Sequence, residues 1–165
     1  MKARAGRRTL ISDGPERTRA FAEALAERLS AGSVISLVGN LGAGKTVFVQ
    51  GLARGLGCRH NVCSPTFVLL RVYSGGRLPL YHVDAYRLRD ASDLSAAGIE
   101  ELLAGDGVTA VEWGDRVDAA MPASTLKIEI SHSDRDTERI ITWDSPDPGI
   151  LRLTDACWLD SHARG

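Results

Sequence analysis

Residues 33–46 read SVISLVGNLGAGKT, and this stretch decides the fold. Its first part, Ser33–Val38, is short, mostly apolar and partly β-branched, which is typical of a strand covered on both faces. The second part, Gly39–Thr46, fits the pattern G-x-x-x-x-G-K-[ST] without a mismatch. A helix is predicted directly after it, over 45–56. A buried strand, a glycine-rich turn and a helix in this order predict a phosphate-binding loop.

Each part of this loop has a chemical use. Glycines let the backbone turn tightly, so that successive amide N–H groups point into one concavity, and the following helix N-terminus adds partial positive charge. Lys45 would place its ammonium against the β- and γ-phosphates, and Thr46 would offer a hydroxyl to Mg²⁺. Lys45 is one of three lysines among 20 basic residues, so lysine stands here where the chain otherwise uses arginine. The residues predicted to bind the nucleotide phosphates are Gly42, Ala43, Gly44, Lys45, Thr46 and Val47.

Two acids follow predicted strands and are candidates for the metal side of the site. Asp84 follows 78–83, and Glu112 follows 108–111. Both stand where catalytic acids lie in open α/β sheets, beyond the carboxyl ends of strands, although an acid there also serves as a simple cap or turn residue. We favour Glu112 as the metal ligand beside Thr46, because its strand is the more fully apolar. Asp84 would then orient water or hold a loop.

Four further residues lie in or beside these motifs, and three of them admit both a functional and a structural interpretation. Thr66, in the sequence SPTF, is placed to meet Mg²⁺ or the γ-phosphate as switch loops do, or is a turn residue before a strand. Trp113 packs against a base or a partner protein, or belongs to the core. Arg87 supplies charge to a transition state or forms a surface ion pair. His82, which alternates along a strand, is interpreted as structural.

The rest of the chain mixes helical and strand patterns. Helices are predicted over Thr18–Leu29, with Thr18 as the N-cap, and over Ala91–Ala104. Strands are predicted over Thr66–Tyr73 and Leu78–Val83 as a hairpin, over Val108–Val111, and over Leu126–Ile130 and Arg139–Trp143 as antiparallel neighbours. We expect an α/β fold, a single P-loop NTPase-like domain over 1–165 with a mixed sheet and helices on both faces. Its core would span about 18–145, with a basic N-terminal arm and a C-terminal tail or short helix.

Composition narrows the class of protein. The chain has 165 residues, 44% apolar and 25% charged, which is typical of one ordinary globular domain. The net charge of −1 argues against binding to nucleic acid or membrane through the overall charge of the domain. No run approaches the roughly 18 apolar residues of a membrane span, and no secretory signal is recognisable, so we expect a cytoplasmic protein with no membrane association.

The motifs together resemble one family. The sequences GNLGAGKT at 39–46, SPTF at 64–67, H-x-D-x-Y-R at 82–87 and Glu-Trp at 112–113 are similar, in order and spacing, to the TsaE family, formerly YjeE. These are small bacterial ATPases needed to make threonylcarbamoyladenosine in tRNA. The similarity spans about 18–143. One departure is the Gly-Asp pair at 114–115, where proline and an acid are common in the family. The resemblance therefore does not predict the backbone conformation after Trp113.

The resemblance implies ligands, partners and roles that spacing alone does not give. The ligands would be ATP and Mg²⁺, with hydrolysis slow alone and coupled to partners. The partners would be TsaD, which transfers the threonylcarbamoyl group, and TsaB, its dimerisation partner, with tRNA reached only through that complex. By motif, the catalytic residues would be Lys45, Asp84 and Glu112, the metal ligands Thr46 and Glu112, and the other nucleotide contacts Thr66 and Trp113.

Two alternatives from other classes remain. A small-molecule P-loop kinase fits the length and the acid beyond a strand, but no arginine-rich segment able to close over two substrates interrupts the chain. Transfer of phosphate to a metabolite rather than to water would identify it. A nucleotide-gated binding module would bind ATP with negligible turnover. A GTPase is disfavoured because the base-reading sequence N-K-x-D is absent.

Overall fold

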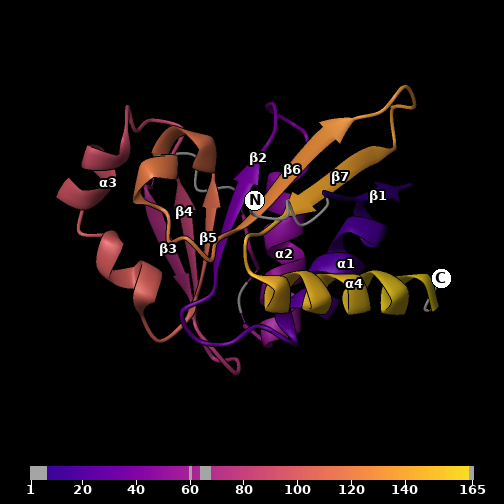
Figure 1. Ribbon diagram of the computed structural model, residues 1–165, viewed down its shortest axis with the longest axis horizontal. Coiled ribbons are helices and arrows are strands. Elements are labelled where there is room, and N and C mark those ends of the chain that lie inside the picture. The colour runs from indigo at the N-terminus through magenta and orange to yellow at the C-terminus, as the bar shows by residue number, and fades with distance from the viewer. Residues whose placement is uncertain (1–6, 60, 64–67, 164–165) are drawn as a thin grey trace.

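The computed structural model describes residues 7–59, 61–63 and 68–163, and it is built around one sheet (Figure 1). The seven strands lie in the order β1-β7-β6-β2-β5-β4-β3. The strands are β1 (Arg8–Ser12), β2 (Val34–Val38), β3 (Leu70–Tyr73), β4 (Leu80–Asp84), β5 (Val108–Glu112), β6 (Leu126–His132) and β7 (Arg139–Asp144).

The sheet is parallel at its centre and antiparallel at its edges. β2 pairs in parallel with β5 and β6, and β4 pairs in parallel with β5. β3 and β4 form the predicted antiparallel hairpin, and β6 and β7 the predicted antiparallel pair. The predicted mixed α/β sheet is therefore confirmed, and the carboxyl ends of β2, β4 and β5 meet at one edge.

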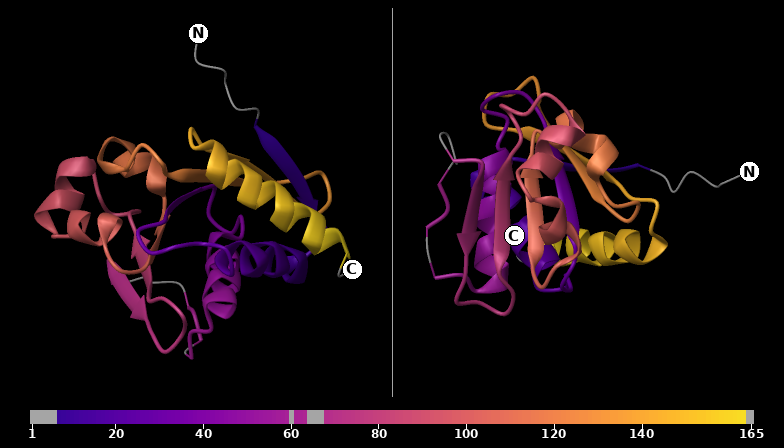
Figure 2. Two further views of the ribbon diagram at one scale, coloured as in Figure 1. Left: turned by 60° about the horizontal axis from the view of Figure 1, so that its bottom comes forward. Right: turned by 90° about the vertical axis from the view of Figure 1, so that its left-hand side faces the viewer.

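Helical segments cover both faces of the sheet, as the sequence predicts. The helices are α1 (Pro15–Ala26), α2 (Lys45–Leu56), α3 (Ala91–Ala96) and α4 (Pro148–Ala163), with short 3₁₀ turns η1 (Glu100–Ala104) and η2 (Gly114–Ala120). α1, α2 and α4 share the larger core cluster, and α3, η1 and η2 share the smaller one on the opposite face. Figure 2 shows the two groups on opposite sides of the sheet.

The apolar run of β2 is explained by this sandwich. Ile35 and Leu37 belong to the larger cluster and Val34 to the smaller one. Because successive side chains of a strand point to opposite faces, a strand covered on both faces needs apolar residues at nearly every position. The strand ends at Val38, where the phosphate-binding loop begins.

Several predicted boundaries differ from the structure, and three of the differences have a clear local reason or consequence. α1 begins at Pro15, so Thr18 is not an N-cap but a buried helical residue whose hydroxyl lies 2.8 Å from that of Ser12. The region predicted as one helix over 91–104 divides into α3 and η1, because Gly98 adopts a φ of 73° that right-handed helices exclude. β3 begins only at Leu70.

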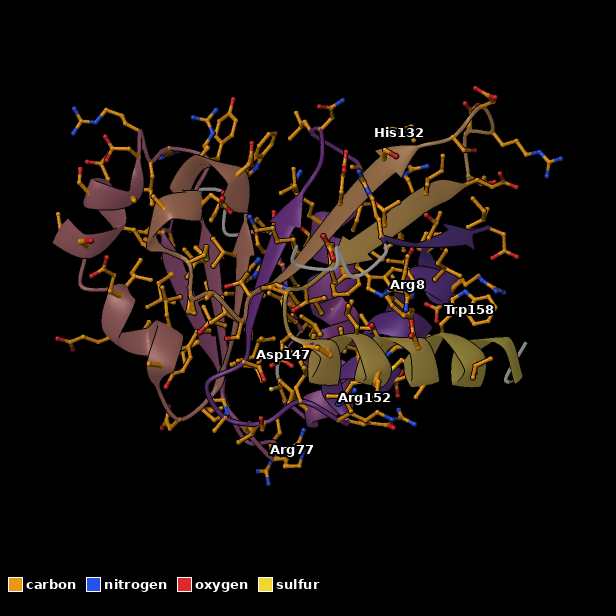
Figure 3. All side chains as sticks on the ribbon, viewed as in Figure 1. Arg8, Arg77, His132, Asp147, Arg152 and Trp158 are labelled. Atoms are coloured by element: carbon orange, nitrogen blue, oxygen red, sulfur yellow. The ribbon has the colours of Figure 1, made fainter. Side chains whose placement is uncertain are left out.

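The two ends of the described chain pack on the domain. β1, which we did not predict, pairs along its length with β7. Arg8 on β1 donates from Nε and Nη2 to the carboxylate of Asp155 on α4, at 2.9 and 3.1 Å, and Figure 3 shows Arg8 beside Trp158 of the same helix. None of the described helices is long and apolar enough to cross a membrane.

α1 and α2 cross at unusually short range. A Cβ added to Gly51 of α2 would lie 2.6 Å from Ala22 Cβ of α1. A Cβ added to Gly55 of α2 would lie 2.8 Å from Ala26 Cβ and closer still to the carbonyl oxygen of Glu23. This contact fixes α2, whose first residue is Lys45, against α1.

We expect Gly55→Ala to destabilise the protein. Alanine would gain up to about 1 kcal/mol of helix propensity, but overpacking against a backbone oxygen costs about 1–3 kcal/mol, so the loss should prevail. Urea unfolding followed by circular dichroism measures the change. A midpoint equal to or above that of the wild-type protein would show that the helices separate without cost.

Candidate nucleotide-binding site

The glycine-rich loop turns at the carboxyl end of β2, at the arrowhead edge of the sheet in Figure 1. Gly42 and Gly44 adopt φ values of 76° and 111°, a region that residues with a Cβ rarely occupy. Among the described residues, the amides of Gly42, Gly44 and Thr46 have no hydrogen-bond acceptor. Free amides at the N-terminus of α2 form a site suited to an anion.

Lys45 lies across this loop with its ammonium group satisfied by the loop itself. Nζ donates to the carbonyl oxygens of Gly39 at 2.6 Å and Asn40 at 3.0 Å, and it lies 4.0 Å from the centre of the Trp113 ring. The residue is only 5% exposed. Burial lowers the pKa of Lys45 from its ordinary value, and nearby carboxylates, first that of Glu112, oppose this shift.

Thr46 and Glu112 meet in front of the loop. Thr46 Oγ1 donates to Glu112 Oε1 at 2.9 Å, and His82 Nε2 lies at 2.9 Å from the same oxygen. Glu112 is 4% exposed, and no described residue donates a hydrogen bond to its Oε2. A hydroxyl and a carboxylate are oxygen ligands of the kind that Mg²⁺ prefers, so this pair fits such an ion.

The residues after Glu112 form an aromatic wall. Trp113 has a left-handed backbone, with φ 59° and ψ 38°, and is the one described non-glycine residue with positive φ. Tyr86 packs against it with ring centres 5.0 Å apart. The next residue, Gly114, lies so close to Ser36 Oγ that a Cβ would collide with it. This answers the question left open by the departure at 114–115, because only glycine fits there.

These elements enclose a pocket of about 420 Å³ at the loop. Among the residues lining it are most of those predicted from the sequence, namely Gly42, Gly44, Lys45, Thr46, Val47, Asp84, Glu112 and Trp113. No group of three or more metal-ligating side chains occurs in the described part of the chain. Mg²⁺ bound with a nucleotide needs only one or two protein ligands, because phosphates and water supply the others.

The sequence matches one protein-family model over most of its length. The family model described as "Threonylcarbamoyl adenosine biosynthesis protein TsaE" matches residues 12–141. The chain belongs to the TsaE family. The matched range contains the loop, both acids and Trp113, so the resemblance stated from the motifs is confirmed.

Curated relatives and a solved structure agree with this assignment. The TsaE protein of Bacillus subtilis is 43% identical over 129 residues, which cover 78% of this chain and 80% of that protein. The TsaE protein of Treponema pallidum is 44% identical over 120 residues, covering 73% and 88%. The crystal structure of Bacillus subtilis YdiB superposes with a TM-score of 0.79 at 34% identity, covering 92% of this chain and 94% of that one. The names of these relatives place TsaE proteins in tRNA threonylcarbamoyladenosine biosynthesis.

Two of the predicted site residues are not among the described residues that line the pocket. Ala43 does not line the pocket, since its amide donates to Asn40 O at 3.0 Å and its side chain is buried. Thr66, with the rest of SPTF, lies outside the described residues. Asp84 lines the pocket but accepts its hydrogen bond from the amide of Tyr86, whereas Glu112 contacts Thr46. Glu112, and not Asp84, is therefore the acid in contact with Thr46, and its role as a metal ligand stays a prediction.

Sequence reasoning missed residues that support the site from outside the motifs. Arg139 on β7 donates from Nε to the carbonyl oxygen of Ala43 at 3.0 Å and so braces the loop. No local pattern indicates this role, because the two residues are far apart in the chain. Arg116 lies over Tyr86, 5.2 Å from the ring centre. Tyr86 itself lies within the H-x-D-x-Y-R sequence at 82–87, but no role was predicted for it.

Proposed function

We propose that this chain is a Mg²⁺-dependent ATPase that acts in the synthesis of threonylcarbamoyladenosine in tRNA. It would hydrolyse ATP in the cytoplasm in association with TsaB and TsaD, and reach tRNA only through that complex. The observation that carries the proposal is the 2.9 Å contact between Thr46 Oγ1 and Glu112 Oε1, beside loop amides that have no acceptor among the described residues. Membership of the TsaE family supports the pathway.

The residues divide the work by their chemistry. The amides at the start of α2 and the ammonium of Lys45 would hold the phosphates. Thr46 and Glu112 would hold the metal ion, which when bound neutralises charge on the phosphate oxygens. Asp84, at the rim of the same pocket, would orient the attacking water. Trp113 and Thr66 are proposed as further nucleotide contacts, Trp113 through its ring face.

The direct test is a binding titration followed by a hydrolysis assay. ATP and GTP are titrated into the full chain with Mg²⁺ and with EDTA, and released phosphate is then measured. We expect Mg²⁺ to strengthen ATP binding and to be required for hydrolysis. Label transferred to a small molecule of a cell extract instead of released as phosphate would identify a kinase. Binding with no turnover under any condition would identify a binding module.

Partner dependence gives a second expected result. Addition of purified TsaB–TsaD complex should raise ATP hydrolysis by about tenfold or more, because groups supplied by a partner accelerate phosphoryl transfer by such factors and larger ones. The measurement is the phosphate release rate at increasing complex concentration. Lys45→Met assayed with the same complex is the control for contaminating ATPases. Equal rates with and without the complex would contradict the coupling.

A further inference from the structure

His82 is a buried imidazole that the proposed mechanism does not use. It is 0% exposed, and its Nε2 lies 2.9 Å from Glu112 Oε1. Its other ring nitrogen, Nδ1, is buried and has no partner among the described residues. A buried polar atom without a hydrogen bond costs about 1–3 kcal/mol, so an imidazole is kept here where an apolar side chain would be less costly.

Strand register explains how His82 reaches the site. In the parallel pair of β4 and β5, Asp84 is opposite Glu112 and His82 is opposite Ala110. Leu80 and Ala110 belong to the core cluster beneath α2, so His82, two residues from Leu80, shares that face. The next residue on that face of β5 after Ala110 is Glu112, and the His82 ring reaches its Oε1.

The direction of this hydrogen bond follows from the acceptor. Glu112 Oε1 already accepts from Thr46, so we assign the hydrogen of this bond to Nε2, which makes the ring the Nε2–H tautomer. Glu112 Oε1 then accepts two hydrogen bonds, one from Thr46 and one from His82. One donor lies on α2 and the other on β4, and together they restrict the rotation of the Glu112 side chain. A single donor would leave this side chain free to turn. The second oxygen, Oε2, accepts none from the described residues.

We propose that His82 is a positioning residue that holds Glu112 through Oε1, so that Oε2 is directed to the metal ion. This inference rests on the proposed function, because a fixed orientation of the Glu112 carboxylate matters only if Glu112 binds Mg²⁺. Partners that orient a metal-binding side chain typically change metal affinity by about 10–100-fold when removed. His82 thus acts on Mg²⁺ without touching the nucleotide.

The test compares two substitutions of His82. His82→Leu fills the space and removes the donor, whereas His82→Gln restores an N–H at similar reach. We expect His82→Leu to raise the Mg²⁺ concentration for half-maximal strengthening of ATP binding by about tenfold or more, and His82→Gln to stay close to the wild-type protein. ATP binding in EDTA should be unchanged in both. Thr109→Val, which removes another fully buried polar group from β5, is the matched control.

The outcomes that overturn the inference are separate from failure of the proposed function. A folded His82→Leu protein with a wild-type Mg²⁺ midpoint overturns it, as does a His82→Gln protein that is folded but no better than His82→Leu. Nitrogen-15 NMR of the histidines, with no nucleotide present, tests the hydrogen bond itself. The His82 ring signals are identified as those missing from the His82→Gln spectrum. They should show the Nε2–H tautomer, and their chemical shifts should change in Glu112→Gln. An Nδ1–H tautomer overturns the inference even if ATP hydrolysis is established.

Discussion

Lys45→Met should lower ATP hydrolysis by roughly 100-fold or more and weaken ATP binding by about 10–100-fold. Methionine keeps most of the length of the side chain beside the Trp113 ring but removes the only lysine ammonium at the loop among the described residues. A compact ammonium fits between phosphate oxygens, so no neighbouring arginine replaces it. Phosphate release and isothermal titration with Mg-ATP measure the two effects.

Lys127→Met is the control for loss of a lysine. Lys127 Nζ lies 2.6 Å from Asp118 Oδ1 on the surface, with both side chains about half exposed. Exposed ion pairs contribute little, so this variant should bind and hydrolyse ATP as the wild-type protein does. Both variants should retain the far-UV circular dichroism spectrum. A folded Lys45→Met protein with normal ATP affinity would show that the loop does not hold phosphates.

Glu112→Gln should lower Mg²⁺-dependent hydrolysis by about 100-fold while leaving ATP binding in EDTA unchanged. The amide oxygen can still accept from Thr46 and His82, so the fold should persist, but the negative charge that would face the metal is lost. The effect should therefore appear only when Mg²⁺ is present. A Mg²⁺ series of binding and turnover measurements separates this from general damage to the site.

Glu138→Gln is the matched control for this change. Glu138 is the last residue of the turn before β7. Its Oε1 lies 2.9 Å from Arg135 Nη1, and the residue does not line the pocket. Its substitution should leave both binding and turnover unchanged. Normal Mg²⁺ dependence in Glu112→Gln would remove this residue from the mechanism and direct attention to Asp84.

Elements with local chemical markers were predicted well from the sequence. α2 runs over Lys45–Leu56 as predicted, because left-handed glycines stand at both ends, Gly44 before it and Gly57 after it. β2 was recognised because burial on both faces requires a nearly continuous apolar run. In both, the information that determines the element lies within the element or next to it.

Elements whose stability comes from distant partners were missed or misplaced. β1 is only five residues, RTLIS, and exists because β7, far along the chain, pairs with it. For α1, Thr18 matched the N-cap preference, but Pro15 begins the helix and Thr18 is buried against Ser12. Proline at the first helical turn was the better marker.

The site shows the same division. Lys45 and Thr46 follow from the loop pattern, and Glu112 from its place at the end of a buried strand. The contact of His82 with Glu112 depends on the register of β4 against β5, which no local pattern encodes, so the histidine was interpreted as structural. Register joins residues far apart in the sequence, and only the assembled sheet shows it.

The hold of Lys45 on the Gly39 and Asn40 carbonyls has a consequence for turnover. If a polyphosphate binds as proposed, its oxygens would replace the Gly39 and Asn40 carbonyls as acceptors for the Lys45 ammonium, so the enthalpy lost with those two hydrogen bonds would offset part of the enthalpy gained. Departure of the product would return the ammonium to the same two oxygens. The Gly39 and Asn40 carbonyls would thus keep the Lys45 ammonium at the loop before a phosphate group arrives and after it leaves.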